Sequence, residues 1–163
     1  MVTAYDREAA VEYARAWALS RNPKYYNFDS LGGDCTNFVS QCLYAGSGVM
    51  NYKPTFGWYY INAGNRTPSW TGVPYLYNFL VRKEGMGPIG TEVSIENVQP
   101  GDVSQFADEP ARFSHSQIIV SAGKVPALDN VLICTHTYDS LDRPLSSYEY
   151  KKIRFIHIDG VIK

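Results

Sequence analysis

Three cysteines and three histidines are the residues of this sequence best suited to nucleophilic and acid–base chemistry. The set comprises Cys35, Cys42, Cys134, His115, His136 and His157. A cysteine can attack a carbonyl carbon when a nearby imidazole takes the thiol proton, so a paired cysteine and histidine would cleave an amide or ester. An odd number of cysteines without CxxC spacing is not typical of a disulfide framework or a zinc site. We therefore expect one working thiol, no metal and no organic cofactor.

Cys35 has the sequence position at which a thiol is activated. The apolar spacing over residues 34–46 predicts a helix with Asp34 as its N-cap, which places Cys35 in the first turn. Unpaired N–H groups and the helix dipole favour a thiolate there. The preceding Gly32-Gly33 lets a substrate approach the backbone and leaves the N–H of Cys35 free to bind an oxyanion. The alternative is a buried packing residue, which is the interpretation favoured for Cys42 and Cys134.

Two histidines lie at the ends of apolar segments that have the pattern of strands. His115 begins the segment 114–121, and His136 ends the segment 131–137. If these strands are antiparallel neighbours, the start of one lies beside the end of the other. One imidazole would then act as the base and the second would orient it. A structural role is the ordinary alternative for a strand histidine, and it is the one expected for His157.

The remaining pattern predicts the elements that position these residues. Helical spacing occurs over 6–20 and 74–84, and short strands are expected at 102–106, 114–121, 131–137 and 153–158. Helices followed by strands indicate an α+β fold with N-terminal helices and a C-terminal antiparallel sheet. Because the chain has 163 residues, we expect a single domain over 1–163.

The segment between residues 47 and 74 combines loop-forming residues with many aromatic rings. We expect an ordered excursion there rather than a disordered linker. Trp58, Tyr59, Tyr60 and Trp70 could form the wall of a substrate cleft for a peptide or for sugar rings. The competing interpretation, which is favoured, is a surface loop whose rings form a satellite core.

Composition and charge argue against several classes of function. Fifteen basic and sixteen acidic residues give a net charge of −1, and they are scattered, so a nucleic-acid partner is not expected. The apolar runs are far shorter than the roughly 20 residues that a membrane span needs. The N-terminus lacks the basic and apolar pattern of a signal peptide. We expect a monomer.

Four segments together resemble a known family. Gly-Gly-Asp-Cys-Thr-Asn-Phe-Val-Ser-Gln at 32–41 resembles the nucleophile motif of the putative amidase domain family, a bacterial branch of the papain-like NlpC/P60 and CHAP group. The segment 99–106 resembles the Pro-Gly-Asp strand of that group, 114–120 its base strand, and 135–139 the strand of its third residue. The resemblance extends from the first helix to about Leu145.

The resemblance implies a papain-like cysteine hydrolase of amide or peptide bonds that works through an acyl-enzyme. Cys35 would attack the carbonyl, His115 would be the general base and then the acid, and His136 would orient His115. Asp139 is an alternative for the third residue. The resemblance also implies bacterial cell-wall peptides as substrates, an extracellular or cell-envelope location and a peptide or peptidoglycan-like partner.

Two supporting roles and two competing functions remain open. Relatives place a tyrosine near the oxyanion, for which Tyr26 is the candidate, and Asp34 has a second role in fixing the loop before Cys35. Thr36-Asn37 stands where Ser-Gly is usual in the NlpC/P60 pattern, which leaves the substrate open. The same three residues would also serve an acyl or peptidyl transferase. A catalytically silent module would use its aromatic excursion to bind wall polymer.

Overall fold

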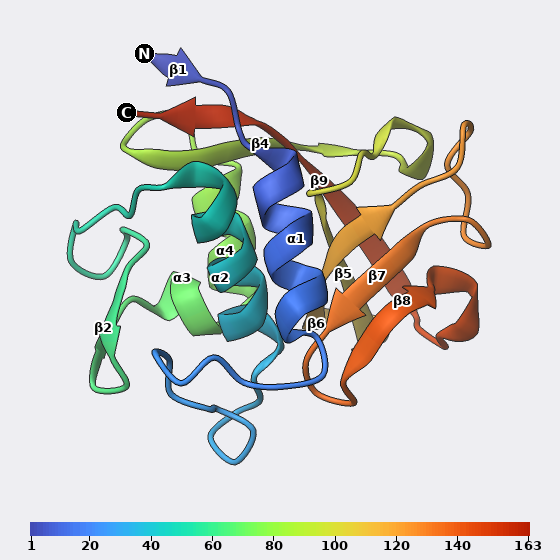
Figure 1. The fold of residues 1–163 in the computed structure, drawn as a ribbon, viewed down its shortest axis with the longest axis horizontal. Helices are drawn as coiled ribbons and strands as arrows, with labels where there is room; N and C mark the ends of the chain where they lie inside the picture. The colour runs from blue at the N-terminus through green and yellow to red at the C-terminus, as the bar shows by residue number, and fades with distance from the viewer.

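The computed structural model describes residues 1–163 as a mixed α+β fold (Figure 1). Its helices are α1 (Arg7–Trp17), α2 (Cys35–Ser47), α3 (Pro68–Thr71) and α4 (Val73–Leu80), with 3-10 turns at η1 (Ile95–Asn97) and η2 (Leu145–Ser147). Its strands are β1 (Val2–Thr3), β2 (Tyr60–Asn62), β3 (Asn65–Arg66), β4 (Gly87–Val93), β5 (Val103–Glu109), β6 (Arg112–Ser121), β7 (Leu132–Thr135), β8 (Ser140–Pro144) and β9 (Lys152–Ile162).

The main sheet is antiparallel throughout. Its strand order is β1-β9-β5-β6-β7-β8, β4 also pairs with β9, and β2 and β3 form a separate hairpin. The predicted α+β class and antiparallel sheet are confirmed, and the four expected strands appear as β5, β6, β7 and β9. The sequence did not indicate β4, because its glycines and proline suggest a loop. Gly90 is needed there, since a Cβ would lie 2.6 Å from the carbonyl oxygen of His157.

Capping residues mark the ends of the first two helices, and two helix boundaries differ from those expected. Asp6 caps α1 by accepting a hydrogen bond from the N–H of Ala9 at 2.9 Å. The second helix runs past the expected end at Gly46 and stops at Gly48, whose φ of 71° suits a residue without a Cβ. The helix expected over 74–84 is shorter and is preceded by the one-turn α3, which the sequence did not reveal.

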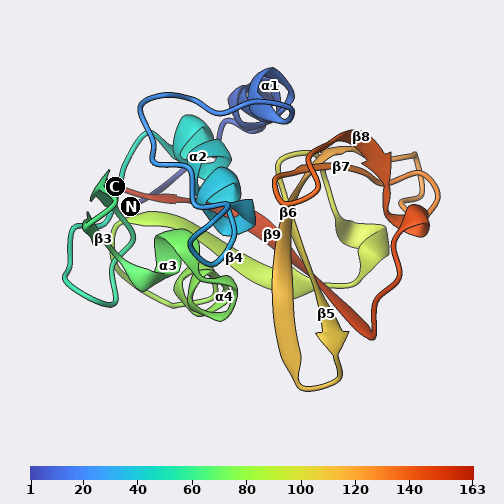
Figure 2. The same cartoon turned by 90° about the horizontal axis from the view of Figure 1, so that it is seen from below.

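The sheet separates two apolar clusters. The larger cluster fills the space between the helices and one sheet face, and it includes Ile118 and Val120 of β6. The smaller cluster lies on the other face and includes Ile119. Figure 2 shows the helices gathered on one side, with β7 and β8 curling away from them. Because successive strand residues face opposite sides, neighbours on β6 contribute to different environments.

The aromatic excursion belongs to the main core. The four rings predicted as a cleft wall are buried or half-buried in or against the larger cluster: Trp58, Tyr59, Tyr60 and Trp70. The indole N–H of Trp58 donates to Ser40 Oγ at 3.1 Å, and that of Trp70 donates to Asn37 Oδ1 at 3.0 Å. These rings are therefore core residues rather than cleft walls. The packing interpretation is correct, except that the rings join the main core and not a satellite.

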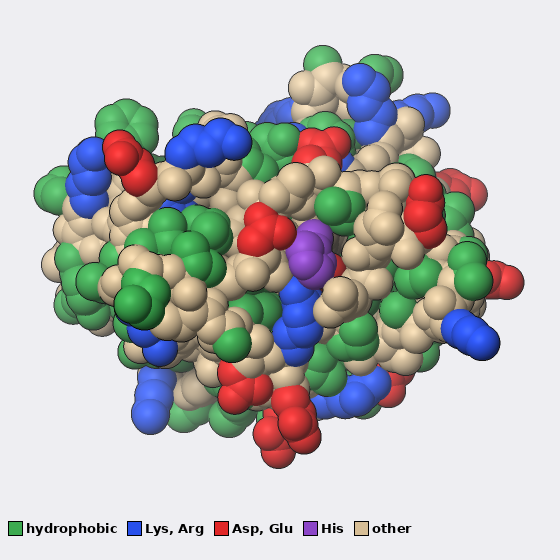
Figure 3. Space-filling view, turned by 90° about the horizontal axis from the view of Figure 1, so that it is seen from above, with side chains coloured by type: hydrophobic (Ala, Val, Ile, Leu, Met, Phe, Trp, Pro, Cys, Tyr) green, Lys and Arg blue, Asp and Glu red, His purple; other side chains and the backbone are tan.

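The outer surface carries charges of both signs. On the face shown in Figure 3, acidic and basic side chains are interspersed without a continuous basic area. None of the helices combines the length and apolar character that a bilayer crossing requires.

Candidate active site

Cys35 is the first residue of α2 and lines an open cleft. Gly32 and Gly33 lead into the helix with φ values of 87° and 98°, which residues with a side chain rarely adopt. The cysteine is 7% exposed and contributes to the wall of a cleft of about 630 Å³. Other wall residues include Gly72, Tyr75, Arg112, Ser114 and Arg154. The N–H of Cys35 has no acceptor within the protein, so it remains available to a substrate oxygen.

Burial and hydrogen bonding shift the pKa of the Cys35 thiol in opposite directions. Burial raises the pKa of Cys35 above its ordinary value, while the N–H groups of Ser116 and Thr36 and the hydroxyl of Thr36 lower it. Burial prevails, so the pKa stays raised and the resting group is a neutral thiol. The same donors would stabilise the thiolate once a base had removed the proton.

A hydrogen-bonded chain connects the thiol to a cation. Thr36 Oγ1 lies 3.7 Å from Cys35 Sγ and 3.0 Å from Ser116 Oγ, and Gln105 Nε2 donates to Ser116 Oγ at 3.1 Å. The oxygen of Gln105 accepts two bonds from Arg154, from Nε at 2.9 Å and Nη2 at 2.7 Å. Because an arginine can only donate, the amide orientation is fixed. Ser116 can then donate to Thr36 and Thr36 to sulfur, so every link points toward the nucleophile.

Replacing Thr36 with valine removes the hydroxyl group that is the last link of this chain. It removes no other interaction of comparable strength. We expect the pH midpoint of Cys35 alkylation by iodoacetamide to rise by about one unit, because a hydrogen bond to an anion is lost. The rate of alkylation against pH measures this midpoint. Thr36→Ser retains the hydroxyl and should keep the original profile. Equal profiles for Thr36→Val and the unaltered protein would show that the chain does not act on the sulfur.

His115 lies on the sheet face opposite Cys35. Its ring packs on Phe106 at a centroid distance of 4.7 Å, and its Nε2 is 3.3 Å from Asp108 Oδ2. It lines a separate cavity of about 440 Å³. The adjacent Ser116 faces α2, so the alternation of side chains along β6 directs His115 to the other side. No hydrogen bond joins His115 to the Cys35 sulfur in this structure.

The structure also separates the two histidines that were predicted to be partners. β6 and β7 are antiparallel neighbours, as expected, with Ile118 opposite Cys134. Continuing this register places Ser116, not His115, opposite His136. A difference of one residue puts two side chains on opposite faces of a sheet. The predicted contact in which His136 orients His115 is therefore not found.

His136 is a buried residue with both ring nitrogens engaged. Its Nδ1 lies 2.5 Å from Asp34 Oδ2, its Nε2 lies 2.7 Å from the carbonyl oxygen of Trp17, and its ring stacks on Phe38 with centroids 4.0 Å apart. A carbonyl oxygen can only accept, so Nε2 donates. If Asp34 is ionised, Nδ1 must donate as well.

The surroundings of Asp34 indicate that it is ionised. Burial acts to raise the pKa of Asp34, but hydrogen bonds from His136, Asn37 and the N–H of Phe28 bring it below its ordinary value. Both ring nitrogens of His136 are then engaged as donors, to Asp34 and to the carbonyl oxygen of Trp17, so neither has a free lone pair with which to act as a base. Asp34 occupies the N-cap position but makes no capping hydrogen bond. The predicted N-cap position is therefore correct, but the Asp34 side chain bonds to Phe28, Asn37 and His136 and so holds the loop before Cys35 instead of capping the helix.

A strained turn after β7 also contacts the loop that precedes Cys35. Thr137 and Tyr138 have φ values of 64° and 60°, and Thr137 Oγ1 accepts a hydrogen bond from the N–H of Asp34 at 3.3 Å. Asp139, the alternative third residue, pairs with Arg21 Nη1 at 2.8 Å instead of with an imidazole. Such strain persists only where surrounding contacts hold it, so the turn is part of the support of the Cys35 loop.

The predicted supporting tyrosine lies outside the cleft. Tyr26 is 45% exposed, its ring packs edge-on against Phe28, and it is not among the wall residues. Tyr75 of α4 lines the cleft in its place. The sequence offered no signal for Tyr75, because only the packing of α4 beside α2 brings it near Cys35.

His157 has the structural role expected for it. Its Nδ1 lies 2.9 Å from Asp102 Oδ2, and Asp102 also pairs with Arg7 at 2.7 Å. This cluster joins α1 to β9 at a distance from the Cys35 cleft.

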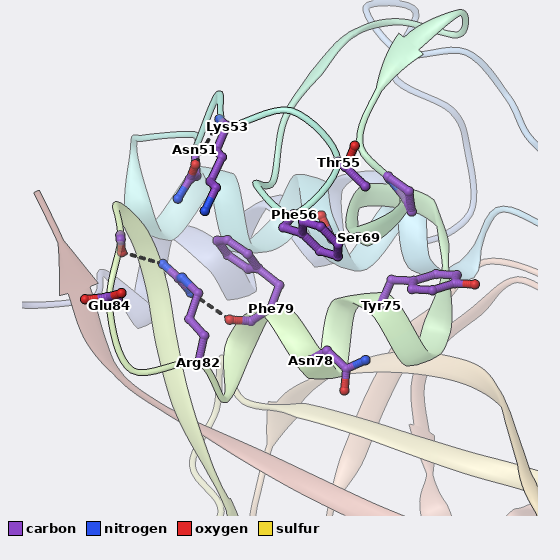
Figure 4. A pocket seen from close by; sticks show the side chains of 12 residues that line it. Asn51, Lys53, Thr55, Phe56, Ser69, Tyr75, Asn78, Phe79, Arg82 and Glu84 are labelled. Atoms are coloured by element: carbon purple, nitrogen blue, oxygen red, sulfur yellow. Dashed lines mark hydrogen bonds between the residues drawn. The ribbon is translucent and has the colours of Figure 1, made fainter.

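The largest cavity, about 720 Å³, lies on the other side of Tyr75 (Figure 4). Phe56, Phe79 and Asn78 are among the residues that line it, but no cysteine or histidine lines it. The Arg82 guanidinium donates hydrogen bonds to four carbonyl oxygens, those of Phe79, Gly85, Met86 and Pro88. Burial lowers the pKa of this arginine to about 10. This cavity therefore lacks the groups needed for nucleophilic catalysis.

Sequence reasoning missed the polar groups that surround the thiol. Gln105 and Ser116 are fully buried on β5 and β6, and Arg154 lies on β9. Polar residues within predicted strands were the available signal, because such groups must be paired when buried.

Comparisons with known proteins identify a family and two relatives. A family model described as "Putative amidase domain" matches residues 4–158. The Bacillus subtilis (strain 168) protein named "Uncharacterized protein YhbB" is 37% identical over 142 residues, covering 83% of this chain and 42% of the relative. "Uncharacterized protein YjcM" of the same organism is 32% identical over 107 residues, covering 64% of this chain and 23% of the relative.

The chain spans less than half the length of these two relatives. No solved structure matches it. The family match covers both the Cys35 loop and the strands that surround it, which is most of the sequence. The chain therefore belongs to the putative amidase domain family.

Proposed function

We propose that this protein is a cysteine-dependent hydrolase of amide bonds, with Cys35 as its nucleophile. The observation that carries the proposal is the thiol at the start of α2, which borders an open cleft and receives donors from Thr36 and Ser116. Donors of this kind stabilise a thiolate, and Cys35 lines a cleft, unlike the fully buried Cys42 and Cys134. The family description supports amide hydrolysis.

The reaction would proceed through a thioester. A base takes the Cys35 proton, the sulfur forms a bond to the amide carbon, and the carbonyl oxygen takes the displaced electron pair while bound to the free N–H of Cys35. The C–N bond then breaks and the amine leaves with the proton from the base. Water attacks the thioester, the carboxylic acid departs, and the thiol is restored.

We infer that His115 is the base, because it is the imidazole that is free to move. His136 is held in a buried ion pair and a second hydrogen bond. His115 has an ion contact with Asp108, whose side chain is 58% exposed, and such contacts contribute less than about 1 kcal/mol. To leave its present position it must give up this contact and the packing of its ring on Phe106, but no hydrogen bond of the kind that holds His136.

A bulge in β6 provides the movement that this role needs. Phe106 pairs with His115 and Ala107 with Phe113, so Ser114 has no partner on β5. Displacing the bulge by one residue reverses the face to which His115 points and turns the imidazole toward Cys35. Hydrogen bonds of catalytic groups commonly shorten only when substrate is bound.

The proposed substrates are peptides of the bacterial cell wall, and the proposed location is outside the membrane. Both follow from the papain-like group that the Cys35 motif resembles. The test is digestion of purified peptidoglycan by the unaltered protein and by Cys35→Ala, with mass spectrometry of the products. We expect fragments with new amino and carboxyl groups that depend on Cys35, and an unchanged melting temperature in the variant.

Three results of this experiment would contradict the proposal. Identical fragments from Cys35→Ala would exclude the thiol as the nucleophile. Sedimentation of both proteins with peptidoglycan, without any cleavage, would favour a binding module. Ligation of an added amine in place of hydrolysis would assign a transferase that uses the same thioester.

Alkylation provides a second test that needs no substrate. Iodoacetamide should modify Cys35 at least about tenfold faster than Cys42 or Cys134 at pH 7.5, because those two thiols are fully buried. Burial also raises the pKa of Cys134 to about 11. Peptide mapping gives the three rates. Slow and equal modification of all three would mean that the cleft does not activate Cys35.

A further inference from the structure

Arg154 is a preorganised cation on the wall of the Cys35 cleft. Its guanidinium lies 3.7 Å from the ring centroid of Tyr77 and 3.9 Å from that of Phe113. The oxygen of Gln105 accepts from its Nε and Nη2. Two rings and a fixed acceptor hold the planar group in one orientation, so little conformational entropy is lost when it binds a ligand.

The charge of Arg154 has no carboxylate partner. It forms no ion pair, in contrast to Arg7 and Arg21, and its Nη1 has no hydrogen-bond acceptor. Glu92 acts on it electrostatically but accepts a hydrogen bond from Tyr77 at 2.6 Å. Keeping a half-buried cation without a counterion is unfavourable unless a ligand supplies the negative charge.

The other charge in the cleft has the same sign. Arg112 lies on its wall, and no aspartate or glutamate does. An anion in this cleft would therefore meet two guanidinium groups and no opposing carboxylate. A planar guanidinium with a free N–H edge binds a carboxylate particularly well.

We propose that the Cys35 cleft selects amide substrates that carry a carboxylate close to the scissile bond, and that Arg154 binds this carboxylate with help from Arg112. The inference rests on the proposed function, because it names the class of substrate for the same cleft. Binding at Nη1 leaves the bonds from Arg154 to Gln105 intact, so the chain that ends at the thiol is preserved.

Two alkylating reagents of nearly equal shape test the proposal without any amidase activity. Iodoacetate carries a carboxylate beside its reactive carbon, and iodoacetamide carries a neutral amide there. In both cases the sulfur forms a bond to the CH₂ carbon and iodide leaves. The measured quantity is the ratio of the two alkylation rates at Cys35, compared with the same ratio for free cysteine at the same pH.

We expect the ratio of iodoacetate to iodoacetamide rates to be at least about tenfold higher at Cys35 than for free cysteine. Arg154→Met keeps the stem between the two rings but removes the charge, and it should abolish the preference. Arg154→Lys retains the charge without the planar group and should retain part of it. Arg143→Met is the matched control, because Arg143 also stacks on a ring, that of Tyr148 at 3.7 Å, on the opposite face of the sheet.

The result that would overturn the inference is a ratio at Cys35 equal to that of free cysteine, or a preference that persists in Arg154→Met with an unchanged melting temperature. If Arg154→Met does not fold, loss of the preference in 0.5 M salt or in Arg112→Met decides the question. Failure of peptidoglycan cleavage with a retained iodoacetate preference would refute the proposed function alone. A digest that depends on Cys35 without this preference would refute the carboxylate site alone.

Discussion

Asp34→Asn should lower the free energy of unfolding by about 3–5 kcal/mol, the cost of leaving one member of a buried ion pair without its partner. The side chains of Asp34 and His136 are each 1% exposed, and Asp34 Oδ2 lies 2.5 Å from His136 Nδ1. Water therefore cannot reach the side chain that is left to take the place of the lost carboxylate. At this chain length the loss corresponds to a decrease of about 10 °C in melting temperature. Thermal unfolding followed by circular dichroism at pH 7 measures the effect.

The pH dependence of stability gives a second measurement of the same pair. The pKa of Asp34 in the folded protein is below its ordinary value of 3.8, so the unfolded chain binds the proton more tightly. The stabilisation is complete above the ordinary pKa and is lost as the pH falls through the lowered one. The difference in melting temperature between the unaltered protein and Asp34→Asn should therefore shrink below about pH 4.

A double variant separates the ion pair from other effects of the substitution. Asp34→Asn combined with His136→Gln should cost much less than the sum of the two single changes, because each single change leaves a lone buried charge and the double variant leaves none. Additive losses would show that the two side chains contribute independently. A difference in melting temperature that stays constant from pH 7 to pH 3 would show that Asp34 is not the ionised partner.

His115→Gln should lower kcat/KM for peptidoglycan cleavage by about 10²–10⁴-fold, the range expected when a general base is removed. Its melting temperature should change by less than about 3 °C, because the ion contact with exposed Asp108 contributes little. His136→Gln should show the opposite pattern: a large decrease in melting temperature and little change in kcat/KM. Initial rates of product release, normalised to folded protein, give the comparison.

Asp108→Asn is the control for His115. It removes the carboxylate that holds the imidazole on the far face of β6, and it should retain cleavage if His115 must leave that face to act. Full activity of His115→Gln would exclude this residue as the base. A parallel loss of activity and stability in His115→Gln would assign it a structural role on the face that it now occupies.

Local patterns in the sequence were sufficient for the elements and for the position of the thiol. The spacing over 34–46 predicted the start of α2 at Cys35, and short apolar runs predicted the strand that carries His115 and the strand that His136 follows. These properties depend on residues close together in the chain, and that is why they could be read without a fold. Gly-rich β4 and the one-turn α3 were missed, because each forms only by packing on distant segments.

The sequence itself determined that Cys35 is the first residue of a buried helix and that an antiparallel sheet beside this helix carries His115. The partners of these residues were decided by the tertiary structure. The register of β6 and β7 put His115 and His136 on opposite faces, since a shift of one residue reverses a side chain. The registers of β5 with β6 and of β5 with β9 brought Gln105, Ser116 and Arg154 together near the thiol. Strand pairing joins residues that lie far apart in the chain, and local spacing carries no information about that choice.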